Sequence, residues 1–152
     1  MTHIRITKRF SFEAAHALAR YDGLCRNIHG HSYHLDVTVK GAVLHDKNSP
    51  KNGMIMDFGE LKQIVQNTII SKIDHALLLN ANSDPVLLDT LQQQFDKVLL
   101  VDYQPTTENM LADFAHKIAA ELPPHIALYC LRMSETDTSF AEWYASDNSE
   151  QK

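Results

Sequence analysis

The chain has 152 residues, 44% of them hydrophobic and 22% charged, with a formal net charge of -5 at pH 7. These values are typical of one compact soluble domain, and they exclude a disordered chain or a membrane-spanning one, because no apolar run approaches the roughly 18 to 20 residues that cross a bilayer. The negative charge disfavours a nucleic-acid partner, which would need clustered lysine and arginine.

Alternating apolar residues predict two long strands near the N-terminus. From Ile4 to His16 the even positions are mostly apolar, so the His16 imidazole should point towards the interior. From His29 to Val43 the odd positions are the inward ones, which places His29 and His31 on the inward face as well. Two neighbouring strands should therefore bring these three imidazoles to the same side of a sheet.

Capping residues and helical spacing predict two helices. A first helix at about 58 to 72 follows Asp57, a good N-cap residue, with Glu60 three positions later. A second helix opens within Pro105-Thr106-Thr107-Glu108 and is stopped by Pro123-Pro124. Three further strands are expected at Val98 to Tyr103, Ile126 to Met133 and Ser139 to Ala145.

The expected elements follow the order strand, strand, helix, strand, helix, strand, strand. This order indicates an α+β domain in which strands pair as hairpins and the helices cover one face of the sheet. A single domain is expected over residues 1–145, followed by a polar tail at 146–152.

The chain has two cysteines, Cys25 and Cys130, too few for the disulfide framework of a small secreted domain. We expect both to be thiols, and we expect Cys130, which lies in an apolar strand, to be a core residue. Because the N-terminal segment also lacks a signal-peptide pattern, a cytoplasmic location is expected.

Three histidines form a candidate zinc site. In His29-Gly30-His31 two imidazoles project from the same side of a strand, about 6 to 7 Å apart along the chain. His16 adds a third nitrogen, which leaves one tetrahedral position for water or substrate, as in catalytic zinc sites. Histidines at this spacing can also be ordinary core or surface residues. Cys25, four residues before His29, could instead complete a closed structural zinc site.

Several short motifs follow one another along nearly the whole chain. They are Phe12-Glu13-Ala14-Ala15-His16, Cys25-Arg26-Asn27-Ile28-His29-Gly30-His31, Met56-Asp57-Phe58, Asp74-His75, Pro105-Thr106-Thr107-Glu108-Asn109 and Ser134-Glu135-Thr136. Together they resemble the signature of the 6-pyruvoyl-tetrahydropterin synthase superfamily. The three residues between Cys25 and His29 resemble the spacing of its bacterial 6-carboxy-5,6,7,8-tetrahydropterin synthase branch.

The resemblance implies that His16, His29 and His31 hold Zn²⁺ and that Cys25 is a base, not a ligand. A free thiol has a pKa of about 8.5, and a nearby cation can bring its thiolate into reach near neutral pH. Zinc would acidify a bound hydroxyl as a Lewis acid.

Further site residues are also implied by the resemblance. Asp74 would orient His75, which exchanges protons with the cysteine, often across a subunit boundary. Without the resemblance this pair is an ordinary helix end. Glu135 would anchor the pterin by accepting two N–H bonds. Thr106, Thr107 and Glu108 would lie beside the pterin pocket. Without the resemblance, the same residues are an ordinary helix opening.

The resemblance further implies a tunnelling fold, with a four-stranded antiparallel sheet and two helices on one face, whose protomers join into a barrel. A homohexamer with active sites at subunit interfaces is expected. The implied reaction converts 7,8-dihydroneopterin triphosphate to 6-carboxy-5,6,7,8-tetrahydropterin with release of acetaldehyde and triphosphate, in queuosine biosynthesis. The alternatives are the sister reaction that gives 6-pyruvoyl-tetrahydropterin and a non-catalytic, zinc-stabilised pterin-binding protein.

One segment departs from the family pattern. Residues 81–97 are longer than the short loop expected there, and Pro85 to Phe95 could form an extra helix. Because this insertion follows Asp74-His75 closely, it could shape pocket access or a subunit contact.

Overall fold

Two long strands form the centre of the sheet in the computed structural model, which describes residues 1–149. Strand β1 (His3–His16) pairs antiparallel with β2 (His29–Ala42) along its whole length, with His16 opposite His29. The even positions of β1 and the odd positions of β2 are the buried ones over the core part of the strands, which confirms the predicted alternation. The last residues of the predicted polar tail, 150–152, lie outside the described part of the chain.

The sheet contains six strands of mixed direction. Its order is β4-β3-β1-β2-β5-β6, where the added strands are β3 (Ala76–Asn80), β4 (Val98–Val101), β5 (Ile126–Ser134) and β6 (Phe140–Tyr144). The four strands β1, β2, β5 and β6 pair antiparallel, whereas β3 runs parallel to both β1 and β4. The expected four-stranded antiparallel sheet is therefore corrected to six strands.

Strand β3 escaped prediction because of its composition. Its sequence ALLLN has no period-two alternation, as is usual for a parallel strand covered on both faces, and such a run cannot be distinguished from a helix by periodicity. The β3–β4 connection contains helix α3 (Pro85–Gln94), capped by the Asp84 carboxylate, which accepts hydrogen bonds from the amides of Val86 and Leu87. The extra helix expected in the insertion is thus confirmed.

Both main helices begin where their caps predict. Helix α1 (Phe58–Val65) continues through a π-helical segment, Gln66–Ile70, into α2 (Ser71–Ile73), and the Asp57 carboxylate accepts from the Gly59 amide at its start. Helix α4 (Thr107–Glu121) starts after Thr106, whose hydroxyl accepts from the Asn109 amide. A four-residue helix, α5 (Ala145–Asn148), occupies the start of the predicted polar tail.

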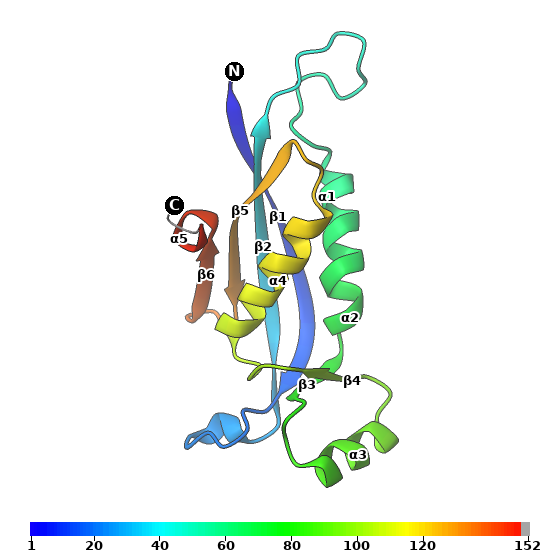
Figure 1. Cartoon of the computed structure of the whole chain (residues 1–152), viewed down its shortest axis with the longest axis vertical. Coiled ribbons are helices and arrows are strands. Elements are labelled where there is room, and N and C mark those ends of the chain that lie inside the picture. Colours follow the sequence, from blue (N-terminus) through cyan, green and yellow to red (C-terminus); the bar gives the residue numbers. More distant parts are fainter. Residues whose placement is uncertain (150–152) are drawn as a thin grey trace.

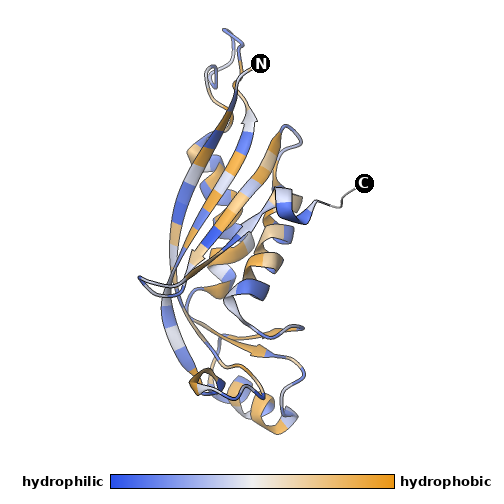
Figure 2. Ribbon diagram, turned by 90° about the vertical axis from the view of Figure 1, so that its left-hand side faces the viewer, coloured by the Kyte–Doolittle hydropathy of each residue, from blue (hydrophilic) through white to orange (hydrophobic). Residues whose placement is uncertain are grey.

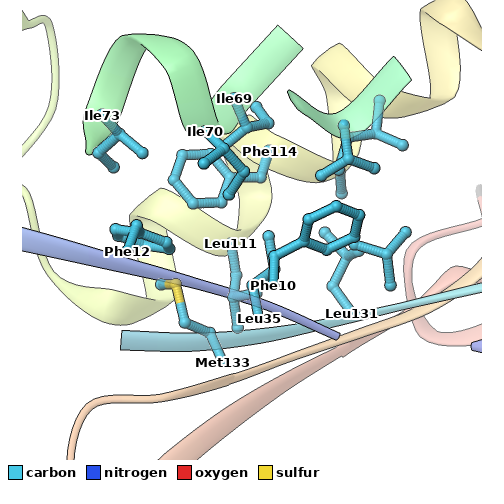
Figure 3. Close-up of a cluster of buried hydrophobic side chains, with 14 of the residues drawn as sticks. Phe10, Phe12, Leu35, Ile69, Ile70, Ile73, Leu111, Phe114, Leu131 and Met133 are labelled. Carbon is cyan, nitrogen blue, oxygen red and sulfur yellow. The ribbon is translucent and has the colours of Figure 1, made fainter. Parts of the chain in front are cut away.

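The helices α1, α2 and α4 cover one face of the sheet, and the core lies between the two layers (Figure 1). Figure 3 shows Phe10, Phe12 and Leu35 of the strands facing Phe114 and Ile70 of the helices. Hydrophobic and polar residues alternate along the long strands (Figure 2), as expected for a sheet with one covered face. Over residues 1–149, no helix is both long and apolar enough to cross a bilayer.

The opposite face of the β1–β2 pair is polar. Its cross-strand contacts include a bidentate pair between Arg9 and Asp36 and a hydrogen bond between Ser11 and His34. His34 therefore points away from the core, as the alternation predicts. The inward face is therefore apolar and the outward face polar. The β1–β2 connection and α3 lie at the lower end of these strands (Figure 1).

Candidate metal centre

Three imidazoles converge at the lower end of the inward face. His16 Nε2 lies 3.1 Å from His29 Nε2, and potential ligand atoms of His16, His29, His31 and Glu135 all lie within 4.8 Å of one another. The β1–β2 register produces this arrangement by placing His16 opposite His29 and Ala14 opposite His31. The three histidines predicted from the alternation are thus brought together.

Backbone carbonyls hold two of the rings in one tautomer. His16 Nδ1 is 2.7 Å from the carbonyl oxygen of Pro105, and His29 Nδ1 is 2.8 Å from that of Asn27. Because a carbonyl only accepts, each Nδ1 must carry the hydrogen, which leaves the Nε2 lone pairs facing the centre of the cluster. Two such lone pairs 3.1 Å apart are unfavourable without a cation between them.

Burial favours the neutral form of His16. Its side chain is 3% exposed, and this desolvation is the largest cause that lowers the pKa of His16, opposed mainly by the hydrogen bond to Pro105. A neutral imidazole is the form that binds a metal ion. The local electrostatics therefore suit a metal ligand better than a charged histidine.

His31 and Glu135 complete the cluster. His31 Nε2 lies 2.8 Å from Glu135 Oε1. This nitrogen is buried, and despite the short distance it has no well-aligned hydrogen-bond partner within residues 1–149. The other carboxylate oxygen of Glu135 accepts a 2.5 Å hydrogen bond from the Thr107 hydroxyl. A cation among the three Nε2 atoms would satisfy the orphaned nitrogen, so the donor set fits Zn²⁺.

Cys25 is not part of this cluster of converging ligand atoms. It belongs to the short 3₁₀ turn Leu24–Arg26, and its backbone carbonyl accepts a hydrogen bond from the Leu18 amide, which ties the turn to the end of β1. Its thiol is partly exposed and is not among the converging ligand atoms. The arrangement therefore favours a histidine site without the cysteine over the closed alternative that includes it.

Asp74 and His75 form a tight turn between α2 and β3. The Asp74 carboxylate accepts from the Glu13 amide at 2.9 Å and lies 3.1 Å from His75 Nδ1. The Glu13 hydrogen bond is the largest cause that lowers the pKa of Asp74, with His75 contributing. His75 itself has a left-handed backbone (φ 61) and donates its amide to the Glu13 carbonyl.

The structure does not bring His75 into the histidine cluster of its own chain. Its side chain is 76% exposed and lines a cavity of about 750 Å³ together with the outward-facing Glu13 and Ser32 and with His31 of the cluster. The inserted segment supplies Leu91 and Phe95 to the opposite wall. Asp74 is thus placed to orient His75, while the imidazole is directed towards the surface.

The three residues predicted at the start of α4 lie in different environments. Thr106 is the N-cap of the helix. Thr107 is buried and holds Glu135, as described above. Glu108 is exposed in the first turn. Of these three predicted residues, only Thr107 directly contacts the cluster.

Two features of the site were missed from the sequence. The Pro105 carbonyl fixes the His16 tautomer, but a backbone acceptor leaves no signal in residue type. Tyr33 is buried two positions after His31 on the inward face. The alternation predicted its direction, but nothing indicated that its hydroxyl would have no partner among residues 1–149.

Comparisons with known proteins agree with this geometry. Residues 5–146 match the family model described as 6-pyruvoyl tetrahydropterin synthase. The chain is 32% identical to a 6-carboxy-5,6,7,8-tetrahydropterin synthase of Haemophilus influenzae over 91% of its length and 97% of the relative, and 32% identical to one of Synechocystis over 92% of each. The fold is similar to that of a Caenorhabditis elegans 6-pyruvoyl tetrahydropterin synthase, with a TM-score of 0.66, 24% identity and coverage of 95% and 97%.

Proposed function

The chain belongs to the 6-pyruvoyl tetrahydropterin synthase family, and from this premise we propose that it is a zinc-dependent lyase acting on 7,8-dihydroneopterin triphosphate. The proposed products are 6-carboxy-5,6,7,8-tetrahydropterin, acetaldehyde and triphosphate, and the proposed pathway is queuosine biosynthesis. The observation that carries this proposal is the convergence of ring nitrogens from three imidazoles with the Cys25 thiol outside the ligand group. The names of the bacterial relatives support the choice of product.

In the proposed site His16, His29 and His31 hold the zinc ion. When bound, zinc supplies a Lewis acid that lowers the pKa of a hydroxyl on the substrate side chain. The Pro105 and Asn27 carbonyls keep the His16 and His29 rings oriented, which is the usual role of partners behind metal-binding imidazoles.

We assign proton movement to Cys25 and His75. The thiol is partly exposed, so it can reach a substrate without displacing a metal ligand. The Asp74 carboxylate, itself held by the Glu13 amide, fixes the His75 ring and stabilises its protonated form. These contacts prepare His75 to return the proton that the cysteine removes.

Glu135 is the proposed pterin anchor. Thr107 donates to one carboxylate oxygen, which fixes the plane of the group, and a carboxylate can accept two parallel N–H bonds from a pterin ring. Thr106 and Glu108 flank Thr107 at the start of α4 and are proposed to border the same pocket. The position of Glu135 next to His31 would bring a bound pterin close to the metal.

The site is proposed to be shared between protomers of a homohexamer whose sheets form a barrel. His75 is not among the converging ligand atoms of its own chain, although the cavity that it lines is also lined by His31, so a neighbouring chain could present its own His75 to this Cys25. Joining sheets edge to edge would also cover the strands β4 and β6, which end the sheet.

Product analysis tests the proposed reaction. The purified zinc form is incubated with 7,8-dihydroneopterin triphosphate, and every product is identified by chromatography and mass spectrometry. We expect 6-carboxy-5,6,7,8-tetrahydropterin with one equivalent each of acetaldehyde and triphosphate. A 6-pyruvoyl product without acetaldehyde would establish the sister reaction instead, and absence of turnover with retained pterin binding would establish the non-catalytic alternative.

A further inference from the structure

Two buried polar side-chain atoms have no hydrogen-bond partner in the described part of the chain: His31 Nε2 and the Tyr33 hydroxyl oxygen. The first is explained by a metal ion among the imidazoles. The second belongs to a side chain that is only 1% exposed. Since nearly all buried hydroxyls are paired with protein, water or ligand, the Tyr33 hydroxyl also requires a partner.

The Tyr33 ring packs directly against the metal centre. Its centroid lies 5.4 Å from that of His31 and 6.3 Å from that of His16, in edge-to-face arrangements with both, and it stacks on Phe12 at 5.0 Å. The stack with Phe12 anchors the ring in the core. Both orphaned atoms thus belong to side chains of the same site.

Two acidic groups of the proposed active site act electrostatically on the hydroxyl. Burial raises the pKa of Tyr33, and the Glu135 carboxylate and the Cys25 thiol raise it further. The hydroxyl therefore lies within electrostatic reach of the proposed pterin anchor and the proposed base, without bonding to either.

We propose that the Tyr33 hydroxyl binds substrate directly, by hydrogen bonding to an oxygen of the hydroxylated side chain on the pterin ring. This inference rests on the proposed function and deepens it, because it names the residue that distinguishes a pterin with a polyhydroxylated side chain from one without. The three imidazoles are committed to the metal and Glu135 to the ring, whereas the Tyr33 hydroxyl is a buried donor without a partner in residues 1–149. A buried donor left unpaired disfavours ligands that lack the matching oxygen.

The variant Tyr33→Phe tests the proposal because it removes one oxygen and keeps the ring that stacks on Phe12. Binding of 7,8-dihydroneopterin and of 7,8-dihydropterin, which has no side chain, is measured anaerobically by calorimetry on the zinc-loaded wild type and variant. We expect the affinity for dihydroneopterin to fall about tenfold, as for loss of one hydrogen bond, with no loss of affinity for dihydropterin. Zinc content should remain the same and the melting temperature should not fall.

Tyr129→Phe provides the matched control, because Tyr129 stacks under Arg5 away from the cluster; this variant should bind both pterins as the wild type does. Equal affinity of Tyr33→Phe and wild type for dihydroneopterin would overturn the role of Tyr33 alone. Equal weakening for both pterins would overturn it too, since it would indicate a packing effect. A wild-type zinc form that binds neither pterin would overturn the proposed function together with this inference.

Discussion

His16 Nε2 and His29 Nε2 face each other at 3.1 Å across the β1–β2 pair, although each ring is fixed from behind by a backbone carbonyl. A direct hydrogen bond between them would require one ring to carry a second proton. Burial of His16 opposes that charge. The pair is therefore built to share a cation, and its protonation should affect both folding and metal binding.

Acid should destabilise the metal-free protein through His16. The pKa of His16 is lowered by burial in the folded chain from the ordinary value of 6.5, so the unfolded chain takes up the proton first as the pH falls. The stabilisation from the neutral ring is complete above about pH 6.5 and is lost as the pH falls through the lower, folded-state pKa. Urea unfolding of the metal-free protein between pH 7.5 and 5 should show this decline.

The variant His16→Gln should show a shallower decline of the unfolding free energy over the same range, because glutamine does not titrate. Its amide can still donate to the Pro105 carbonyl, which preserves that contact. His116→Gln, at an exposed position of α4, serves as the control and should follow the wild type. An unchanged slope in His16→Gln would show that His16 does not govern the acid sensitivity.

Cys25→Ala should lower turnover strongly and leave the zinc in place. A base that transfers protons accounts for roughly 100-fold to 10,000-fold in rate, whereas the thiol is outside the group of converging ligand atoms. Metal analysis after dialysis should give one zinc per chain, with the wild-type melting temperature. Loss of both zinc and folding would mean that the cysteine is a structural ligand.

Cys130→Ala is the matched control, since Cys130 is buried in β5 and has no proposed part in the reaction. It should retain zinc and turnover, at a cost to stability of about 1 kcal/mol for the lost buried sulfur.

Glu135→Gln distinguishes a pterin anchor from a fourth metal ligand. The carboxylate lies against His31 and is held by Thr107, so its position alone is compatible with either role. As the anchor, its loss of charge should weaken dihydropterin binding by roughly 10-fold to 100-fold with zinc content unchanged. Parallel loss of zinc would assign it to the metal instead; Glu142→Gln, at an exposed position of β6, should change neither.

Mixing two inactive variants tests the shared site. If Cys25 of one chain works with His75 of its neighbour, refolding Cys25→Ala with His75→Ala subunits at equal amounts should restore up to about one quarter of the wild-type sites by random association. Activity is compared with each variant refolded alone. Failure to recover any activity, with subunit exchange demonstrated by mass spectrometry, would contradict a site made from two chains.

The sequence predicted the site well where side-chain direction decides it. Alternation along β1 and β2 was enough to put His16, His29 and His31 on one inward face, because parity in a strand determines the face. Once the two strands pair antiparallel, the register between them brings the three imidazoles together. Helices α1 and α4 were equally predictable, because Asp57 and Thr106 are N-caps whose function depends on local sequence alone.

The remainder depends on contacts between distant segments. Strand β3 is continuous in hydrophobicity, and only its parallel pairing with β1 identifies it as a strand. The Pro105 carbonyl reaches His16 from 89 residues away, and the unpaired Tyr33 hydroxyl is defined by what surrounds it. Such features follow from the assembled fold and have no local pattern by which they could be predicted.

Zinc K-edge X-ray absorption on the zinc-loaded protein tests the central claim most directly, since it reports the atoms that surround the metal. We predict a shell of nitrogen and oxygen at about 2.0 to 2.1 Å, with the multiple scattering of three imidazoles and no sulfur. The same spectrum is expected for Cys25→Ala. A sulfur shell at about 2.3 Å that disappears in Cys25→Ala would contradict the claim that three histidines hold the metal while the thiol remains free.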